Sequence, residues 1–150
     1  MLDKRIFKVP AGAGKTLHAF GSEFTIHLGG QETEGKFCMF TEVTPPGGGP
    51  PPHLHKAEEE WFYPLEGRVE FFIDGGWQEV PLGTTVYVPR GTVHTFRNPG
   101  DSPSRMLMGI SPAGIETFFE RCAEVFARPE PPEMEKIATI GAEFGIEFVD

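Results

Sequence analysis

Short runs in which apolar and polar residues alternate dominate the first two-thirds of the chain. Phe24, Ile26 and Leu28 alternate with polar residues, and this period of two gives a strand one apolar face. Extended segments bounded by turn residues are predicted at about residues 4–9, 16–20, 23–28, 36–43, 60–65, 68–73, 77–80, 84–88, 93–98 and 104–110. Asp74-Gly75-Gly76 predicts a hairpin turn between two of them. The spacing predicts an all-β sandwich or barrel.

After these segments the period changes to that of a helix. Apolar residues recur at helical spacing at Ile115, Phe118, Phe119, Cys122, Val125 and Phe126. We expect an amphipathic helix with Ser111 as its cap and Pro112 in its first position. The proline-rich residues 129–132 end it, and a second short helical segment is predicted at about 133–142. A last extended segment is predicted at 146–149.

Composition and charge narrow the class of partner. The 150 residues fit one domain, and 19 Gly, 15 Pro and 14 Phe favour short strands joined by tight turns. A formal charge of −9 and a pI near 5.0 disfavour nucleic-acid and membrane partners, so we expect a small-molecule partner. The first residues, MLDKRIFKVP, lack the apolar run of a signal peptide, and we expect a cytoplasmic protein. Cys38 and Cys122 have no paired spacing and predict inert buried thiols.

Two histidines two residues apart form the centre of a candidate metal site. They lie in the pattern Gly47-x5-His53-x-His55-x4-Glu60-x6-Gly67. On an extended strand, His53 and His55 project from the same face. Glu60 comes at the beginning of the next strand and adds an anionic oxygen. The run GGGPPP before His53 cannot form a helix and stiffens the approach.

A second pattern, Gly83-x5-Pro89-x-Gly91-x2-His94-x3-Asn98, supplies a fourth ligand. Proline fixes φ and glycine accepts a turn conformation that other residues resist, so His94 follows directly after a turn. We expect Gly91 and Asn98 to be architectural, with Asn98 fixing the end of the strand. Three neutral imidazoles and one carboxylate suit one divalent transition metal, Fe, Mn, Ni, Cu or Zn, and do not choose among them.

The two patterns resemble the two signature motifs of the cupin superfamily at every defining position, and the chain most resembles small single-domain members of the quercetinase-like or uncharacterised kind. The resemblance implies a double-stranded β-helix, or jelly-roll barrel. The core of this barrel would be formed by about residues 23–110, and one or two short C-terminal helices would follow at about 111–142. The whole chain, residues 1–150, would form a single domain. Cupins commonly pair through sheet edges, so we expect a homodimer in which the N-terminal strands cover an edge of the partner.

Three functions fit a cupin with this ligand set. The first is a metal-dependent dioxygenase of the quercetinase-like kind, which acts on a small aromatic or enolic compound and uses Glu60 as ligand and catalytic base. The second is an isomerase, epimerase or lyase for a small polar substrate. It needs cationic pocket walls, whereas Arg68 and Arg97 lie out of phase with the inward positions. The third is a non-catalytic small-molecule binding module.

The aromatic residues of the strands are candidates for the pocket wall. These are Phe40, Phe62, Phe72 and Phe96, and Phe96 shares the alternation of His94. Glu60 is preferred as ligand over its neighbours because it alone fits both spacings and alternates in phase with Phe62. Glu58 and Glu59 are therefore expected to face solvent.

Three further features do not enter the predicted site. His18 and His27 belong to no ligand pattern, so we expect structural or surface roles for them. The stretch AGAGKT at 11–16 suggests a phosphate-binding loop, but the full pattern needs a glycine where Val9 stands. No strand-then-helix context surrounds it, and nucleotide binding there is excluded.

Overall fold

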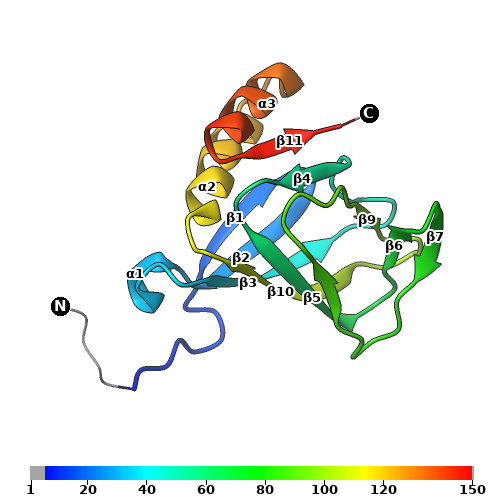
Figure 1. Ribbon diagram of the computed structural model, residues 1–150, viewed down its shortest axis with the longest axis horizontal. Coiled ribbons are helices and arrows are strands. Elements are labelled where there is room, and N and C mark those ends of the chain that lie inside the picture. Colours follow the sequence, from blue (N-terminus) through cyan, green and yellow to red (C-terminus); the bar gives the residue numbers. More distant parts are fainter. Residues whose placement is uncertain (1–5, 150) are drawn as a thin grey trace.

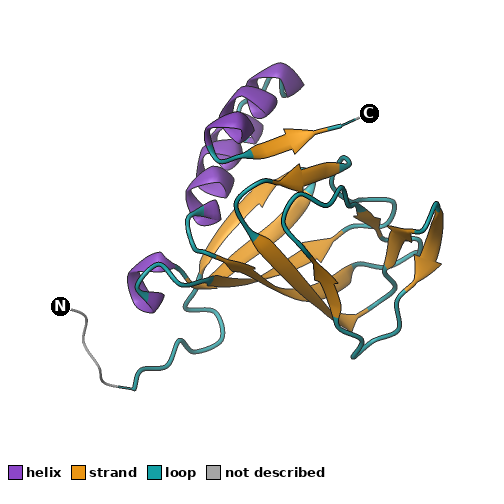
Figure 2. Ribbon diagram, viewed as in Figure 1, coloured by secondary structure: helices purple, strands orange, loops and turns teal. Residues whose placement is uncertain are grey.

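The computed structural model describes residues 6–149, and its regular structure is mostly antiparallel strands (Figures 1 and 2). The largest sheet has the strand order β1-β2-β3-β10-β5-β8. Its strands are β1 (Lys15–Ala19), β2 (Ser22–Leu28), β3 (Cys38–Thr44), β10 (Ser104–Ser111), β5 (Glu59–Glu66) and β8 (Val86–Val88). Strand β10 lies between β3 and β5, so segments far apart in the sequence are neighbours.

Two smaller sheets complete the core. One has the order β7-β6-β9, and the other pairs β11 with β4. Their strands are β4 (His53–His55), β6 (Glu70–Ile73), β7 (Gly76–Glu79), β9 (Phe96–Arg97) and β11 (Ile146–Phe148). The ring of Phe62 from β5 packs against those of Phe71 and Phe96, so the sheets face one another across a shared core.

This arrangement is consistent with the predicted jelly-roll fold in its mostly β content, its sheets and its few short helices. Strand pairing within residues 6–149 gives three sheets instead of one closed barrel. The strands of the two smaller sheets are only two to four residues long, so their ladders end before they reach the edges of the large sheet.

Most predicted strands are present with shifted ends, and one is absent. No strand forms at residues 6–9, while residues 4 and 5 of that predicted segment lie outside the described residues. The predicted hairpin turn joins β6 to β7. Asp74 and Gly75 adopt φ values of 51° and 82°, as a two-residue hairpin turn with two positive φ angles requires.

Helix α2 (Ile115–Phe126) begins later than the sequence predicts. The prediction of Ser111 as its cap is wrong, because Ser111 is the last residue of β10 and pairs with Glu59 in β5. Its hydroxyl donates a hydrogen bond of 2.6 Å to the carbonyl oxygen of Lys36. Pairing within the sheet therefore overrides the local capping signal, and Gly114 occupies the N-cap position.

The C-terminal elements cover one end of the core. The predicted second helix is α3 (Met134–Glu143), and an unpredicted short helix, α1 (Gly30–Thr33), follows β2. Helix α2 buries its apolar face against β1 and α3. Strand β11 then pairs antiparallel with β4, and Figure 1 shows the two side by side beneath the helices. Strand β11 thus pairs with the strand that carries two of the predicted ligands.

Both cysteines are buried and unpaired, as predicted. Burial raises the pKa of the Cys38 thiol above its ordinary value, and burial raises that of Cys122 to about 12, so both stay protonated. In the part of the chain that the structure describes, no helix has both the length and the apolar character that a membrane crossing needs. Strand β1 lies at one edge of the large sheet. Dimerisation and the cytoplasmic location stay predictions.

Candidate metal centre

Two short antiparallel segments hold three imidazoles together. His53 and His55 lie on β4, and His94 faces His53 through two backbone hydrogen bonds. The His53 N–H donates to the His94 carbonyl at 3.1 Å, and the His94 N–H donates to the His53 carbonyl at 2.9 Å. The N–H of Gly91 donates to the His55 carbonyl at 2.7 Å, so the predicted turn is tied to β4. The two motifs are thereby joined through their backbones.

Glycine and asparagine fix the loops around these histidines. Gly49 has φ of 154°, and a Cβ there would lie 2.1 Å from the carbonyl oxygen of Phe96. Only glycine permits this close approach. The buried amide of Asn98 donates to the carbonyls of Thr44 and Ser102 at 3.0 and 2.8 Å, as expected of a residue that ties down a strand end.

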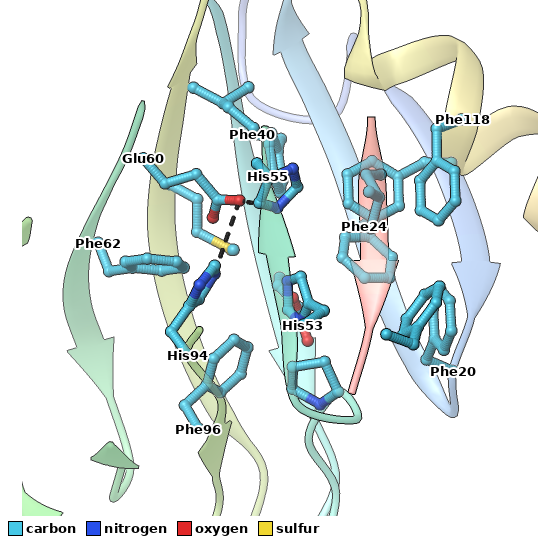
Figure 3. Close-up of a pocket in the computed structure, with 17 residues that line it drawn as sticks. Phe20, Phe24, Phe40, His53, His55, Glu60, Phe62, His94, Phe96 and Phe118 are labelled. Carbon is cyan, nitrogen blue, oxygen red and sulfur yellow. Dashed lines mark ion pairs between the residues drawn. The ribbon is translucent and has the colours of Figure 1, made fainter. Parts of the chain in front are cut away.

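Glu60 on β5 completes a cluster of four side chains. One ligand atom from each of His53, His55, Glu60 and His94 lies within 4.8 Å of the other three. Figure 3 shows the carboxylate of Glu60 between His55 and His94, with an ion pair drawn to each. His55, Glu60 and His94 are buried, and His53 is half-buried. The predicted ligand set is therefore brought together.

The hydrogen bonds of the imidazoles suit a metal ion. Nδ1 of His53 lies 2.8 Å from the Pro51 carbonyl, and Nδ1 of His94 lies 2.9 Å from the Thr92 carbonyl. A carbonyl only accepts, so each Nδ1 donates and each Nε2 keeps its lone pair. Nε2 of His94 is buried without a hydrogen-bond partner among the described residues. In metal sites, a histidine ligand usually donates one ring N–H to a carbonyl or carboxylate and binds the metal through the other ring nitrogen. His53 and His94 have this arrangement, so the residues present fit a metal ion.

Charge within the cluster shifts the pKa values of its members. Burial lowers the pKa of His53 to about 4, helped by His94, so this ring is neutral. Burial alone would lower the pKa of His55, but the adjacent Glu60 and Glu58 outweigh it and raise the pKa to about 9. Burial alone would raise the pKa of Glu60, but His55 and the other two histidines hold it below its ordinary value. Without metal, His55 and Glu60 thus form an imidazolium–carboxylate pair.

The expectation that Glu58 faces solvent is wrong. Glu58 is 8% exposed, and its Oε2 lies 3.6 Å from Nδ1 of His55 on the side away from Glu60. The turn between β4 and β5 folds it behind the His55 ring, an effect that strand alternation does not describe because residues 56–58 are not in a strand. Glu59 does face outward, where Arg90 donates to its carboxylate at 2.5 Å.

The cluster opens into a cavity walled by aromatic rings. Figure 3 shows Phe62 and Phe96 beside His94, and Phe20, Phe24 and Phe118 across from them. The cavity has a volume of about 50 Å³, which holds only a few water molecules. No lysine or arginine of residues 6–149 lines it. The lining residues are Phe20, Phe24, Phe40, Glu42, Pro50, His53, His55, Glu60, Phe62, His94, Phe96, Met108, Ile110, Phe118, Phe119, Ile146 and Phe148.

Three of the four aromatic residues proposed for the wall are there, and one is not. Phe40, Phe62 and Phe96 line the cavity. The prediction of Phe72 is wrong, because it alternates with the buried Phe71 and so lies on the outer face. Phe72 is 46% exposed and packs edge-on against Trp77.

The two histidines and the 11–16 stretch that were predicted not to belong to the metal site also lie outside the cavity. His18 is exposed beside Glu23, and His27 hydrogen-bonds to Thr41 at 3.0 Å. The 11–16 stretch forms a turn that enters β1 and is followed by no helix.

The two arginines considered for binding a polar substrate lie outside the cavity. Arg68 pairs with Glu79 on the surface. Arg97 pairs with Glu70 and lies 4.0 Å above the Trp77 ring. Neither guanidinium reaches the cavity.

Sequence reasoning missed one polar residue of the cavity, Glu42. A signal for it exists, because Glu42 and Phe40 are two apart on β3 and therefore share a face. It also missed Phe20, Phe118, Phe119 and Phe148, which come from α2, β11 and the turn before β2. Their positions depend on how the C-terminal elements pack, which periodicity does not specify.

Comparison with known proteins is consistent with this geometry. Residues 40–110 match the Cupin_2 family model, described as a cupin domain. Quercetin 2,3-dioxygenase of Bacillus subtilis is 32% identical over 99 residues, which are 64% of this chain and 28% of that protein. Polyketide synthase CurC of Streptomyces cyaneus is 36% identical over 74 residues, 49% of this chain and 48% of that protein. The chain therefore spans between about a quarter and a half of these relatives.

A solved structure shows the same fold. It is that of a predicted oxalate decarboxylase from Thermotoga maritima, which has a TM-score of 0.65 and 20% sequence identity. The match covers 71% of this chain and 99% of that one. At this level of identity the likeness is one of fold alone.

Proposed function

This chain belongs to the cupin superfamily, and we propose that it is a metal-dependent dioxygenase of a small aromatic or enolic compound. One observation carries the proposal: three imidazoles and one carboxylate converge on a cavity whose other walls are almost entirely aromatic and aliphatic. The likeness to a quercetin dioxygenase supports the reaction type. The activity of the whole relative is a proposal for this chain, since the two overlap only in part.

His53, His55, Glu60 and His94 would hold one divalent metal ion. Such an ion, when bound, binds an ionised substrate hydroxyl and promotes its reaction with O2. In the proposed reaction both atoms of O2 enter the catechol or enol, which supplies all four electrons itself, so the reaction needs no external reductant. Fe, Mn, Ni and Cu all suit the donor set, which mixes borderline nitrogen ligands with one carboxylate oxygen.

Glu60 is proposed as the group that receives the substrate proton. Its neighbouring histidines hold its pKa below the ordinary value, so the carboxylate is ionised near neutral pH and able to accept a proton. The carboxylate faces the cavity between His55 and His94, where a substrate hydroxyl beside the metal site would lie. One residue would thus serve as both ligand and base.

The phenylalanine walls select for flat apolar compounds and exclude water. Phe24 and Phe119 stack with ring centroids 4.5 Å apart, and Phe40 packs edge-on against Phe119 at 5.3 Å. Ligand sites usually measure roughly 300–1,000 Å³, far more than the 50 Å³ here. We therefore propose a substrate with one ring or a short conjugated chain, not a flavonol, and entry requires the rings from the C-terminal elements to move aside.

A redox-neutral reaction on the same enolic class of compound is the second candidate. The buried carboxyl of Glu42 favours it, since a second acid–base group can return to one position of a substrate a proton that Glu60 removes from another. The likeness to a polyketide synthase protein is in keeping with an enolic substrate. A small anionic substrate is disfavoured, because the described cavity wall holds no lysine or arginine.

Oxygen uptake tests the proposal. Metal-free protein would be loaded anaerobically with Fe, Mn, Ni or Cu and then mixed with a panel of catechols and enolic diketones in an oxygen-electrode cell. We expect uptake with at least one metal, incorporation of both atoms of ¹⁸O2 into one product, and loss of both in the His53→Ala, His94→Ala double variant. Ligand binding without oxygen uptake under every metal would contradict dioxygenation and favour the redox-neutral reaction or a binding module.

A further inference from the structure

Glu42 is a second carboxyl group in the cavity, and the proposed chemistry at the metal does not use it. It lies on β3, is 4% exposed, and lines the cavity. Its direct neighbours across the sheet are Phe24 on β2 and Met106 on β10, both buried and apolar. No cation among residues 6–149 pairs with it. Thr44 donates to its Oε2 at 3.1 Å, which leaves most of its hydrogen-bonding capacity for another partner.

The register of β10 places Glu42 and Glu60 at opposite ends of the cavity. Glu42 lies opposite Met106, and Glu60 lies opposite Ile110. These two β10 residues are four apart, so both side chains project from the same face of the sheet, and their backbone positions are about 13 Å apart along the strand direction at roughly 3.3 Å per residue. Side chains that point inward from these positions close part of that gap. The cavity therefore has polar groups at two ends and phenylalanine rings between them.

The surroundings of Glu42 favour the neutral acid. Burial is the chief cause that raises its pKa; the hydroxyls of Ser22 and Thr44 lower the pKa, the charge of Glu60 raises it, and the net result is a pKa of about 7. The strands that pair with β3 place Phe24 and Met106 beside it, and among the described residues Glu60 is the charged group that contributes to its pKa shift. A neutral carboxyl both donates and accepts, so it recognises a carbonyl or a hydroxyl oxygen equally.

We propose that Glu42 hydrogen-bonds a second oxygen of the substrate, at the end of the molecule that lies away from the metal. This rests on the proposed function and deepens it: the substrate carries two oxygen functions, an enol or phenol at the metal and a carbonyl or hydroxyl across the ring or conjugated chain. The apolar neighbours of Glu42 would make this contact selective, because a substrate without that oxygen leaves the part of the buried carboxyl that Thr44 does not bind without a partner. Glu42 thus selects the substrate, while Glu60 acts at the reacting end.

A matched pair of probes tests this without turnover. 3,4-Dihydroxyacetophenone and 4-ethylcatechol have the same catechol and nearly the same size, but only the first has an oxygen across the ring. Binding of each to zinc-loaded protein, which is redox-silent, would be measured by isothermal titration calorimetry. We expect the ketone to bind roughly tenfold more tightly, the effect of one added hydrogen bond. Glu42→Leu should abolish the preference, and Glu42→Gln, which keeps a donor and an acceptor, should retain part of it.

Controls separate this inference from the function on which it rests. Zinc content should be unchanged in both Glu42 variants, and the surface variant Glu79→Gln should keep the full preference. The same preference in Glu42→Leu as in the parent overturns the role of Glu42, whether or not the metal-loaded enzyme consumes oxygen. A preference that depends on Glu42, in a protein that consumes no oxygen, supports the inference and refutes dioxygenation. Failure of both probes to bind the parent overturns the inference, while oxygen uptake with the full panel of catechols and enolic diketones decides dioxygenation separately.

Discussion

Replacing Glu42 by glutamine should change how the stability of the protein depends on pH. Folding raises the pKa of this carboxyl from its ordinary value of 4.5 to about 7, chiefly through burial. Below pH 4.5 the group is protonated in both states and favours neither. Between pH 4.5 and 7 the unfolded chain loses the proton while the folded protein keeps it, so stability falls as pH rises through this window.

The size of the effect follows from the two pKa values. At about 1.4 kcal/mol per pH unit, ionisation of Glu42 costs the folded protein about 3 kcal/mol of unfolding free energy above pH 7. Glutamine has nearly the same shape, can still accept from Thr44, and does not titrate. Burial of the glutamine amide lowers the free energy of unfolding by an amount that does not vary with pH. Relative to the parent, Glu42→Gln should therefore gain up to about 3 kcal/mol between pH 4.5 and 8.

Urea unfolding of the metal-free protein at several pH values measures this difference. The free energy of unfolding would be obtained by linear extrapolation for the parent, for Glu42→Gln and for the surface control Glu79→Gln. The other ionisable groups are the same in parent and variant, so their titration cancels when the two free energies of unfolding are subtracted at each pH. A parent-to-variant difference that stays constant from pH 4.5 to 8 would show that Glu42 ionises normally, and would refute the description of it as a buried neutral acid.

Three further predictions concern the metal site. Glu58→Gln should weaken metal binding by roughly 10- to 100-fold, because the Glu58 carboxylate lies 3.6 Å from Nδ1 of His55 and its charge attracts the N–H of that ring when Nε2 binds metal. Glu59→Gln should leave metal binding unchanged, and competition with a chelator measures both variants. The affinity for the metal should rise about tenfold per pH unit between pH 6.5 and 8.5, since His55, with a pKa of about 9, must lose a proton to bind the metal. Calorimetry that shows no pH dependence of metal binding would contradict this. Gly49→Ala should lower the free energy of unfolding by about 3 kcal/mol or more, since the Cβ of the alanine would overlap the Phe96 carbonyl. Thermal unfolding measures this, and an unchanged melting temperature would contradict the close approach of this loop to Phe96.

The parts of the fold that depend on local pattern could be predicted from the sequence. Alternation located most strands of the large sheet, and the turn at Asp74 and Gly75 follows from the conformations those residues accept. His53 and His55 could be predicted because two residues two apart on one strand share a face, a constraint that holds whatever the rest of the chain does, whereas Glu60 and His94 followed from the spacings of the two motifs.

What could not be predicted depends on contacts between distant segments. Ser111 has the local features of a helix cap, but its pairing in β10 decides its conformation. Glu58 lies in a turn, where no period applies, and the structure alone places it behind His55. The position of β11 over β4 is fixed by the packing of α2 and α3, so Phe148 reaches the cavity from a segment more than 90 residues beyond His53.

The most direct test of the metal centre is the metal content of protein purified without added metal and without nickel affinity. It would be measured by elemental analysis for the parent and for the His53→Ala, His94→Ala double variant, each before and after reloading. We expect about one transition-metal ion per chain in the parent and none in the variant. A parent that holds no metal even after reloading, while folded, would contradict the four-ligand centre.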